Sequence, residues 1–418
     1  MYLSLRKVID EIKIIDDHGH PGLFKAIDEL GMPEDALFPF KDTFSVPKAQ
    51  SYGFDYLEEL HYEAYEKLHG FTRADLDNPE KHKELAKKYE KQQENLGSFM
   101  DEVMEAAGVE YLMVNLAIPE SLQNKKSIGF IPSVDALLFP FNNEYMFGKP
   151  FSKIYLKQFE HYLKLYKKEY SFTKENFTFE EYMNFADEVL EGIKEKGQLG
   201  YKFICGYART TYFEKTELDN GAELFNKAKN GDTEAYNSFQ NMMAWYIFRK
   251  AAKLDMPIQV HMAMIDGDTE NTNPLNFKAL TMDEVASKTK LVILHCGYPR
   301  FAETTTLMLA AKLFSQNNMY IDLSGRVMFG NHPKVIAKNI RNWLDYPSLW
   351  GKIMYGSDVL LGNRVIYTAA KTGRDAVYYA LESAIDDGLI SEQTAISIAK
   401  GILRNNAINV YNLPLAKA

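Results

Sequence analysis

Apolar residues gather in eight short runs along the chain, and each run is followed by a stretch of loop or helical spacing. Runs of nearly continuous apolar character are expected of parallel strands that are covered on both faces, and their alternation with helical stretches indicates βαβ units. This pattern predicts an α/β fold and leaves two architectures open, a (β/α)8 barrel of TIM type and a doubly wound sheet. The eight runs are residues 12–20, 109–118, 127–134, 199–207, 256–262, 290–298, 318–324 and 351–358.

Two long stretches between these runs have the pattern of inserted helices. Residues 37–104 and 139–197 are rich in Tyr, Phe, Lys and Glu, and apolar positions such as Phe159, Tyr162 and Leu163 follow helical spacing. We expect both stretches to form extra helices near the mouth of a barrel. Packing of these aromatic side chains between helices is favoured over an aromatic substrate box.

The size and composition of the chain fit one decorated barrel. A single α/β barrel with insertions can reach the length of 418 residues. With 46% hydrophobic and 25% charged residues, the chain can form a large core without disulfides or structural metals. Residues 374–413 have the pattern of amphipathic helices that close the barrel. We therefore predict a single barrel domain over residues 1–418.

Charge and sorting signals narrow the classes of partner. The net charge of −9 at pH 7, without a separate basic stripe, argues against nucleic acid and anionic membranes as partners. The N-terminus lacks the pattern of a secretory signal, and no run of 18 apolar residues occurs. Cys205 and Cys296 lie far apart within apolar runs, which suits buried free thiols in a reducing compartment. We expect a cytoplasmic protein with a small-molecule substrate, and a homodimer.

Metal-competent side chains end four of the apolar runs. His18 and His20 are separated by one glycine, so both imidazoles lie on one side of an extended strand. His261, His295 and Asp358 end three other runs. In a (β/α) barrel the carboxyl ends of the strands meet on one face, and polar groups at such buried positions need a partner or a metal. The set predicts a metal centre, although Asp358 alone could equally begin a helix as its N-cap.

These residues resemble the amidohydrolase superfamily, whose pattern is His-x-His after the first strand, a histidine after the fifth and the sixth, and an aspartate after the eighth. More narrowly, the chain is similar to the branch that includes the nodulin-like domain preceding glutamine synthetase. One departure is Met262-Ala263 after His261, where the branch is expected to have Thr-Gly. The supporting segments are PIQVH with Asp266 and Asn273-Pro274-Leu275 beyond it, LHCGYP, YIDLS, YGSD, TAAKTGRDAV and AKGILRNNAINVYNL.

The resemblance implies a ligand set and a division of roles. His18, His20, His261 and Asp358 are implied to hold one divalent ion per chain, with Zn²⁺ as the first choice and Mn²⁺ or another divalent ion as the alternative. Asp358 is also implied as the general base that takes the proton of the attacking water and returns it to the leaving amine. For His295, polarisation of the substrate carbonyl is favoured over binding of a second metal.

Further polar residues follow strand ends and are candidate substrate contacts. For all of them except Lys202, a loop hydrogen bond or a surface salt bridge is an equal alternative. Lys202 is also at the position where binuclear members of the superfamily carry a carboxylated lysine, but we favour one metal and a snorkelling or carboxylate-binding lysine. The candidates are Lys202, Tyr207, Arg209, Asp266, Tyr298 and Arg326, whereas His61, His69, His82, His161 and His332 are interpreted as structural or solvated.

The sequence thus predicts a metal-dependent hydrolase that uses a metal-activated water to cleave an amide or related C–N or C–O bond of a small carboxyl-derived substrate. A metal-dependent decarboxylase of a small unsaturated or aromatic acid is the first alternative, because its ligand set is nearly the same. A non-catalytic binding or scaffold barrel is the second. The complete ligand set argues against a scaffold, although fold alone does not decide function.

Overall fold

A computed structural model describes residues 2–48, 55–148, 151–265, 267–314, 318–325 and 330–418. The chain divides into two compact units, which are described separately. The first unit comprises residues 1–29, 40–130 and 321–418, and the second unit comprises residues 30–39 and 131–320.

Eight strands form at the eight predicted apolar runs. Nearly all of their residues are buried. This explains why the runs lack the alternation of apolar and polar residues that a strand with one solvent-exposed face would have. The strands are β1 (Ile14–Gly19), β2 (Val109–Leu116), β3 (Ile128–Pro132), β4 (Tyr201–Phe203), β5 (Ile258–Val260), β6 (Leu291–Ile293), β7 (Met319–Asp322) and β8 (Ile353–Met354).

In the first unit, neighbouring strands are parallel. β1 pairs with β2, and β7 pairs with β8 through Ile321 and Ile353. The amide of Asp17 donates to the carbonyl of Tyr355 at 3.0 Å, so the chain that continues β8 lies beside β1. The last strand of the chain is therefore linked to the first.

In the second unit, β4, β5 and β6 are parallel in chain order. Ser133, directly after β3, forms a parallel bridge with Lys202 of β4. The amide of Leu291 in β6 donates to the carbonyl of Asn318, the residue before β7, at 2.9 Å. Strand links that follow chain order and return from β8 to β1 are those of a TIM-type (β/α)8 barrel with helical insertions. The predicted barrel is confirmed over the doubly wound sheet.

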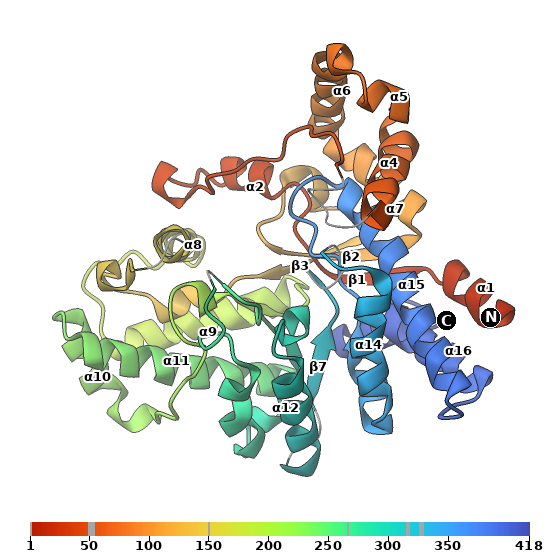
Figure 1. Cartoon of the computed structure of the whole chain (residues 1–418). Helices are drawn as coiled ribbons and strands as arrows, with labels where there is room; N and C mark the ends of the chain where they lie inside the picture. Colours follow the sequence, from red (N-terminus) through yellow and green to blue (C-terminus); the bar gives the residue numbers. More distant parts are fainter. Residues whose placement is uncertain (1, 49–54, 149–150, 266, 315–317, 326–329) are drawn as a thin grey trace. The chain divides into compact units, whose positions relative to one another are not determined.

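The helices of the first unit include the first insertion. α14 and α15 lie side by side in Figure 1, in agreement with their extensive contacts. The helices are α1 (Leu3–Glu11), α2 (Leu23–Glu29), α4 (Asp55–His69), α5 (Arg73–Leu76), α6 (His82–Glu94), α7 (Leu96–Ala107), α14 (Pro333–Leu344), α15 (Arg364–Asp386), α16 (Glu392–Lys400) and α17 (Asn406–Tyr411), with a π-helical turn at Gly401–Asn405.

The helices of the second unit include the second insertion. A capping box at Thr178 begins α9, where the Thr178 side chain accepts from the Glu181 amide and the Glu181 side chain accepts from the Thr178 amide. The helices are α8 (Ser152–Glu169), α9 (Phe179–Glu195), α10 (Gly221–Lys229), α11 (Thr233–Leu254) and α12 (Phe301–Phe314).

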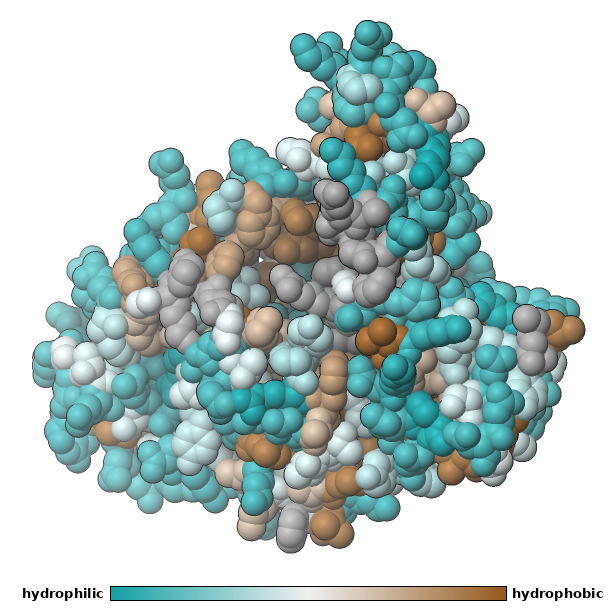
Figure 2. All heavy atoms as spheres, in the orientation of Figure 1, coloured by the Kyte–Doolittle hydropathy of each residue, from teal (hydrophilic) through white to brown (hydrophobic). Residues whose placement is uncertain are grey.

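Aromatic side chains of the insertions pack between helices, as the spacing predicts. In the first unit, Tyr62, Tyr65 and Phe71 form a buried cluster, and the outer surface of α4–α6 is mostly hydrophilic (Figure 2). In the second unit, Phe159 of α8 stacks on Phe139, with ring centroids 5.2 Å apart. Burial of large aromatic rings is a major favourable term in the packing of such helices.

One buried cation holds two helix ends in the first unit. The guanidinium of Arg374 donates to the carbonyls of Ile9 and Ile12 at the end of α1, and to those of Ala107 and Gly108 at the end of α7, at 2.9–3.3 Å. A positive charge there complements both helix dipoles. Gly108 closes α7 with φ of 66°, and a Cβ at this position would lie 2.7 Å from Arg374 Nη2.

Candidate metal centre

The first unit brings together three of the four predicted metal ligands. His18 and His20, at the end of β1, are only 1% and 5% exposed. Asp358 Oδ1 lies 3.5 Å from His18 Nε2 and 3.2 Å from His20 Nε2. One nitrogen of each imidazole and one carboxylate oxygen lie within 4.8 Å of one another. This arrangement is what the sequence predicts for residues after the first and the eighth strand.

The chain after β8 places Asp358 through its backbone. The amide of Asp358 donates to the carbonyl of His18 at 2.7 Å, and the amide of His20 donates to the carbonyl of Val359 at 2.7 Å. Asp358 has φ of 50°, in the left-handed region that aspartate tolerates better than most residues. These two hydrogen bonds fix the carboxylate beside the histidines.

Both histidines have Nδ1 tied to a neighbour and Nε2 directed to the same carboxylate. His20 Nδ1 lies 3.1 Å from the carbonyl oxygen of Asn115, which can only accept, so Nδ1 carries the proton and the Nε2 lone pair is available. His18 Nδ1 lies 2.9 Å from Ser324 Oγ. Such outer hydrogen bonds are the usual partners of histidines that ligate metals. The donor set therefore fits a borderline divalent ion.

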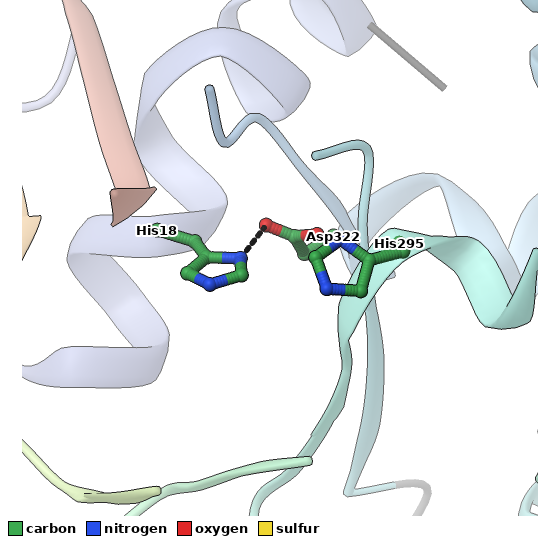
Figure 3. A group of neighbouring side chains, drawn as sticks. All are labelled: His18, His295 and Asp322. Atoms are coloured by element: carbon green, nitrogen blue, oxygen red, sulfur yellow. Dashed lines mark ion pairs between the residues drawn. The ribbon is translucent and has the colours of Figure 1, made fainter. Parts of the chain in front are cut away.

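Asp322 and Ser324, which sequence reasoning missed, lie next to Nδ1 of His18. Asp322 ends β7, and its Oδ2 lies 3.8 Å from His18 Nδ1 (Figure 3). Asp322 Oδ1 accepts from both the amide and the hydroxyl of Ser324. The signal in the sequence was YIDLS, where two polar residues end an apolar run as the candidate ligands do.

Three buried aspartates lie on β1 and β7 in the neighbourhood of His18. Asp16, Asp17 and Asp322 are each 0% exposed. Burial raises the pKa of Asp16 to about 7, although its carboxylate accepts from the amides of His18 and Ser357. Burial raises the pKa of Asp17 well above its usual range, and the charge of Asp322 adds to this effect. Asp16 thus links the backbone of β1 to the loop that carries Asp358.

The second unit brings together the remaining two predicted histidines. His295 Nε2 lies 3.0 Å from His261 Nδ1, so a hydrogen bond joins the two imidazoles. His295 is buried and has φ of 59°, followed by Cys296 at 56° and Gly297 at 72°. A left-handed conformation at a histidine and a cysteine stores strain that surrounding structure must offset.

An aromatic pair lies next to this histidine pair. The ring of Tyr207 has its centroid 4.9 Å from that of His261. The Tyr207 ring also stacks on Tyr155 of α8, with centroids 4.1 Å apart. Helix α8 of the second insertion therefore packs against Tyr207, one of the predicted substrate contacts.

The other candidate substrate residues have different surroundings. Lys202 is fully buried in β4. Arg209 donates to the side-chain oxygens of Gln240 and Asn241 on α11, and burial lowers its pKa. Tyr298 packs edge-on against Phe301, with centroids 5.8 Å apart. Asp266 and Arg326 lie outside the described residues.

The histidines interpreted as structural bond to nearby groups or lie in helices. His82 and His161 bond through Nε2 to the carbonyls of Leu76 and Leu30. Burial lowers the pKa of His61 to about 3 and that of His69 to about 4. His332 is the N-cap of α14. Cys205 and Cys296 are both buried, as predicted, and neither is in a disulfide within the described residues.

The structure resembles three solved proteins over nearly its whole length. A protein of Lactobacillus casei ATCC 334 described as a metal-dependent hydrolase is 16% identical, with 98% of this chain and 97% of that chain covered and a TM-score of 0.63. Uronate isomerase of Thermotoga maritima is 12% identical, with 98% of each chain covered and a TM-score of 0.66. Glucuronate isomerase of Caulobacter crescentus is 11% identical, with coverage of 99% and 94% and a TM-score of 0.62. At these identities the likeness concerns the fold.

A family model described as amidohydrolase matches residues 220–413. No curated protein gives a significant match to the sequence. In the part of the chain that the structure describes, no helix is both long and apolar enough to cross a membrane. The fold is that of a TIM-type barrel, and the donor set at the ends of β1 and β8 is one that could hold a divalent metal ion. The matched residues include β5 to β8 with His261, His295 and Asp358, so this part of the chain is similar to the amidohydrolase family.

Proposed function

We propose that this enzyme is a hydrolase that cleaves an amide or related C–N or C–O bond of a small carboxyl-derived substrate with a metal-activated water. One observation carries the proposal: the Nε2 atoms of His18 and His20 converge on Asp358 Oδ1. A donor set of imidazoles with a carboxylate suits a catalytic zinc site of this kind.

We assign the ion to His18, His20, Asp358 and His261, with Zn²⁺ favoured over Mn²⁺ and one ion per chain. The first three are supported by their geometry in the first unit, and His261 by the resemblance of the sequence. When bound, such an ion lowers the pKa of a water molecule and polarises a carbonyl.

The chain itself supplies proton transfer and orientation. Asp358 accepts the proton of the attacking water and delivers it to the leaving amine, which is the usual reversal of base and acid roles. His295 donates a hydrogen bond to the substrate carbonyl and to the oxyanion that develops from it. Its hydrogen bond to His261 supports a shared role of the two imidazoles in the second unit. Tyr207 forms part of the substrate wall.

The test combines metal analysis with product analysis. Purified protein is analysed for divalent ions and assayed against γ-glutamyl amides, lactones, aromatic acids and a uronate in ¹⁸O-labelled water. We expect about one ion per chain and label in the released carboxylate. Release of CO₂ with no label in a product carboxylate would indicate the decarboxylase. Conversion of the uronate to an isomer with no label in its carboxylate would indicate an isomerase. Full activity of metal-free protein would contradict the proposal.

Three further properties remain proposals that rest on composition. These are a location in the cytoplasm, a homodimeric state, and a small-molecule substrate without nucleic acid or membrane partners. Light scattering of the purified protein measures the oligomeric state directly. A monomer would contradict the homodimer without affecting the proposed reaction.

A further inference from the structure

The two histidines of β1 are held by chemically different partners. His20 Nδ1 faces the backbone carbonyl of Asn115 at 3.1 Å, whereas His18 Nδ1 faces the side chain of Ser324 at 2.9 Å. A hydroxyl can donate or accept, so it fixes the tautomer of His18 only if its own hydrogen is committed elsewhere.

Asp322 commits that hydrogen. Its Oδ1 accepts from the hydroxyl of Ser324, and the Ser324 amide donates to the same oxygen at 2.9 Å. With its hydrogen directed to Asp322, the Ser324 oxygen offers a lone pair to His18. All three side chains are buried, so bulk water does not compete for these bonds. Nδ1 of His18 then carries the proton, and Nε2 presents its lone pair towards Asp358.

We propose that Ser324, oriented by Asp322, is a positioning residue for His18, and that β7 takes part in the metal centre without supplying a ligand. The inference rests on the proposed function, because it assigns His18 Nε2 to the ion. The charge of Asp322, connected through the hydroxyl, also raises the basicity of His18 Nε2, whereas the partner of His20 is a neutral carbonyl.

The inference is tested with three variants and one control. Ser324→Ala removes the hydroxyl, Ser324→Thr retains it, and Asp322→Asn keeps an acceptor oxygen but removes the charge. Thr372→Ala is the control, because Thr372 is a buried hydroxyl residue of α15. Zn²⁺ affinity is measured by competition with a chelator. The tautomer of His18 is measured in metal-free protein by ¹⁵N NMR of the imidazoles, and circular dichroism checks the fold.

We expect Ser324→Ala to weaken Zn²⁺ binding by about 10- to 100-fold, which is the usual effect of losing such a partner. Ser324→Thr should restore most of the affinity, and Asp322→Asn should lie between wild type and Ser324→Ala. Wild-type His18 should be protonated at Nδ1, and Ser324→Ala should give a mixture of tautomers. Thr372→Ala should leave both readouts unchanged.

Failure of this inference and failure of the proposed function give different results. Unchanged Zn²⁺ affinity and an unchanged His18 tautomer in folded Ser324→Ala would overturn the positioning role while leaving the metal centre intact. If wild type binds no ion, the proposed function fails, and the tautomer in metal-free protein still decides whether Ser324 orients His18. If Ser324→Ala does not fold, the affinity and tautomer of Asp322→Asn decide, because wild-type values there would overturn the role of Asp322.

Discussion

The two units position their histidines by different means. In the first unit, hydrogen bonds to Nδ1 orient His18 and His20, so both Nε2 atoms converge on one carboxylate. In the second unit, His295 is placed by a left-handed backbone and bonds directly to His261. A hydrogen-bond partner of Nδ1 can thus select which ring nitrogen is available, whereas a strained backbone selects only where the ring lies.

The largest effect is expected from loss of a histidine in the first unit. His18→Ala removes a metal bond, so the ion content should fall from about one per chain to near zero and metal-dependent turnover should be lost. Metal analysis and an activity assay measure both. His161→Ala is a matched control, because His161 bonds to a backbone carbonyl of the second unit. Retention of the ion in His18→Ala would show that Nε2 of His18 does not hold it.

Asp358→Asn should lower kcat by about 10²- to 10⁴-fold, which is typical for loss of a general base. Asparagine keeps the shape and an oxygen, and it tolerates the left-handed backbone that the residue adopts. The ion content and the melting temperature should stay close to wild type. Steady-state kinetics on the identified substrate provides the measurement, and wild-type turnover of the variant would contradict the role of Asp358.

His295→Asn should lower kcat by about 10²- to 10³-fold while the ion stays bound, because it removes one donor to the developing oxyanion. Asparagine also adopts the left-handed backbone readily, so the local strain should not rise. Kinetics and metal analysis on the same preparation make the distinction. Loss of the ion would place His295 among the ligands and make the two units more alike.

A smaller effect is expected from buried histidines outside the metal centre. Burial lowers the pKa of His61 to about 3 and of His69 to about 4, so the unfolded state binds more protons than the folded state below about pH 6.5. The stability that these histidines contribute is present above pH 6.5 and falls as the pH decreases, by about 1.4 kcal/mol per pH unit for each histidine.

Hydrogen exchange of α4 amides between pH 7 and pH 4.5 measures this loss, once the intrinsic exchange rates are corrected for pH. Metal-free protein is used, so release of the ion does not contribute. A His61→Leu variant should show a shallower dependence, because one of the two titrating groups is gone. An equal slope in wild type and variant would show that His61 does not bind a proton on unfolding.

The strands and the first part of the site could be predicted from local pattern. Each apolar run became a strand, because nearly continuous apolar sequence is stable only where both faces are buried. The pairing of His18 and His20 followed from the two-residue period of a strand, and Asp358 from the rule that strand ends of a barrel meet. These inferences need only the chain direction and the order of the strands.

From the sequence alone we could predict the barrel, the metal-competent strand ends and the resemblance to the amidohydrolase superfamily. The folded structure was needed to show which ring nitrogen of His18 and His20 is available to a metal ion, and which neighbours hold the other nitrogen. Ser324 lies 306 residues from His18, and no local pattern predicts a hydrogen bond over that separation. The left-handed backbone of His295 was equally hidden, because only a small minority of histidines adopt it. Such contacts are set by strand register and by competition among buried polar groups for partners, and both are properties of the folded chain.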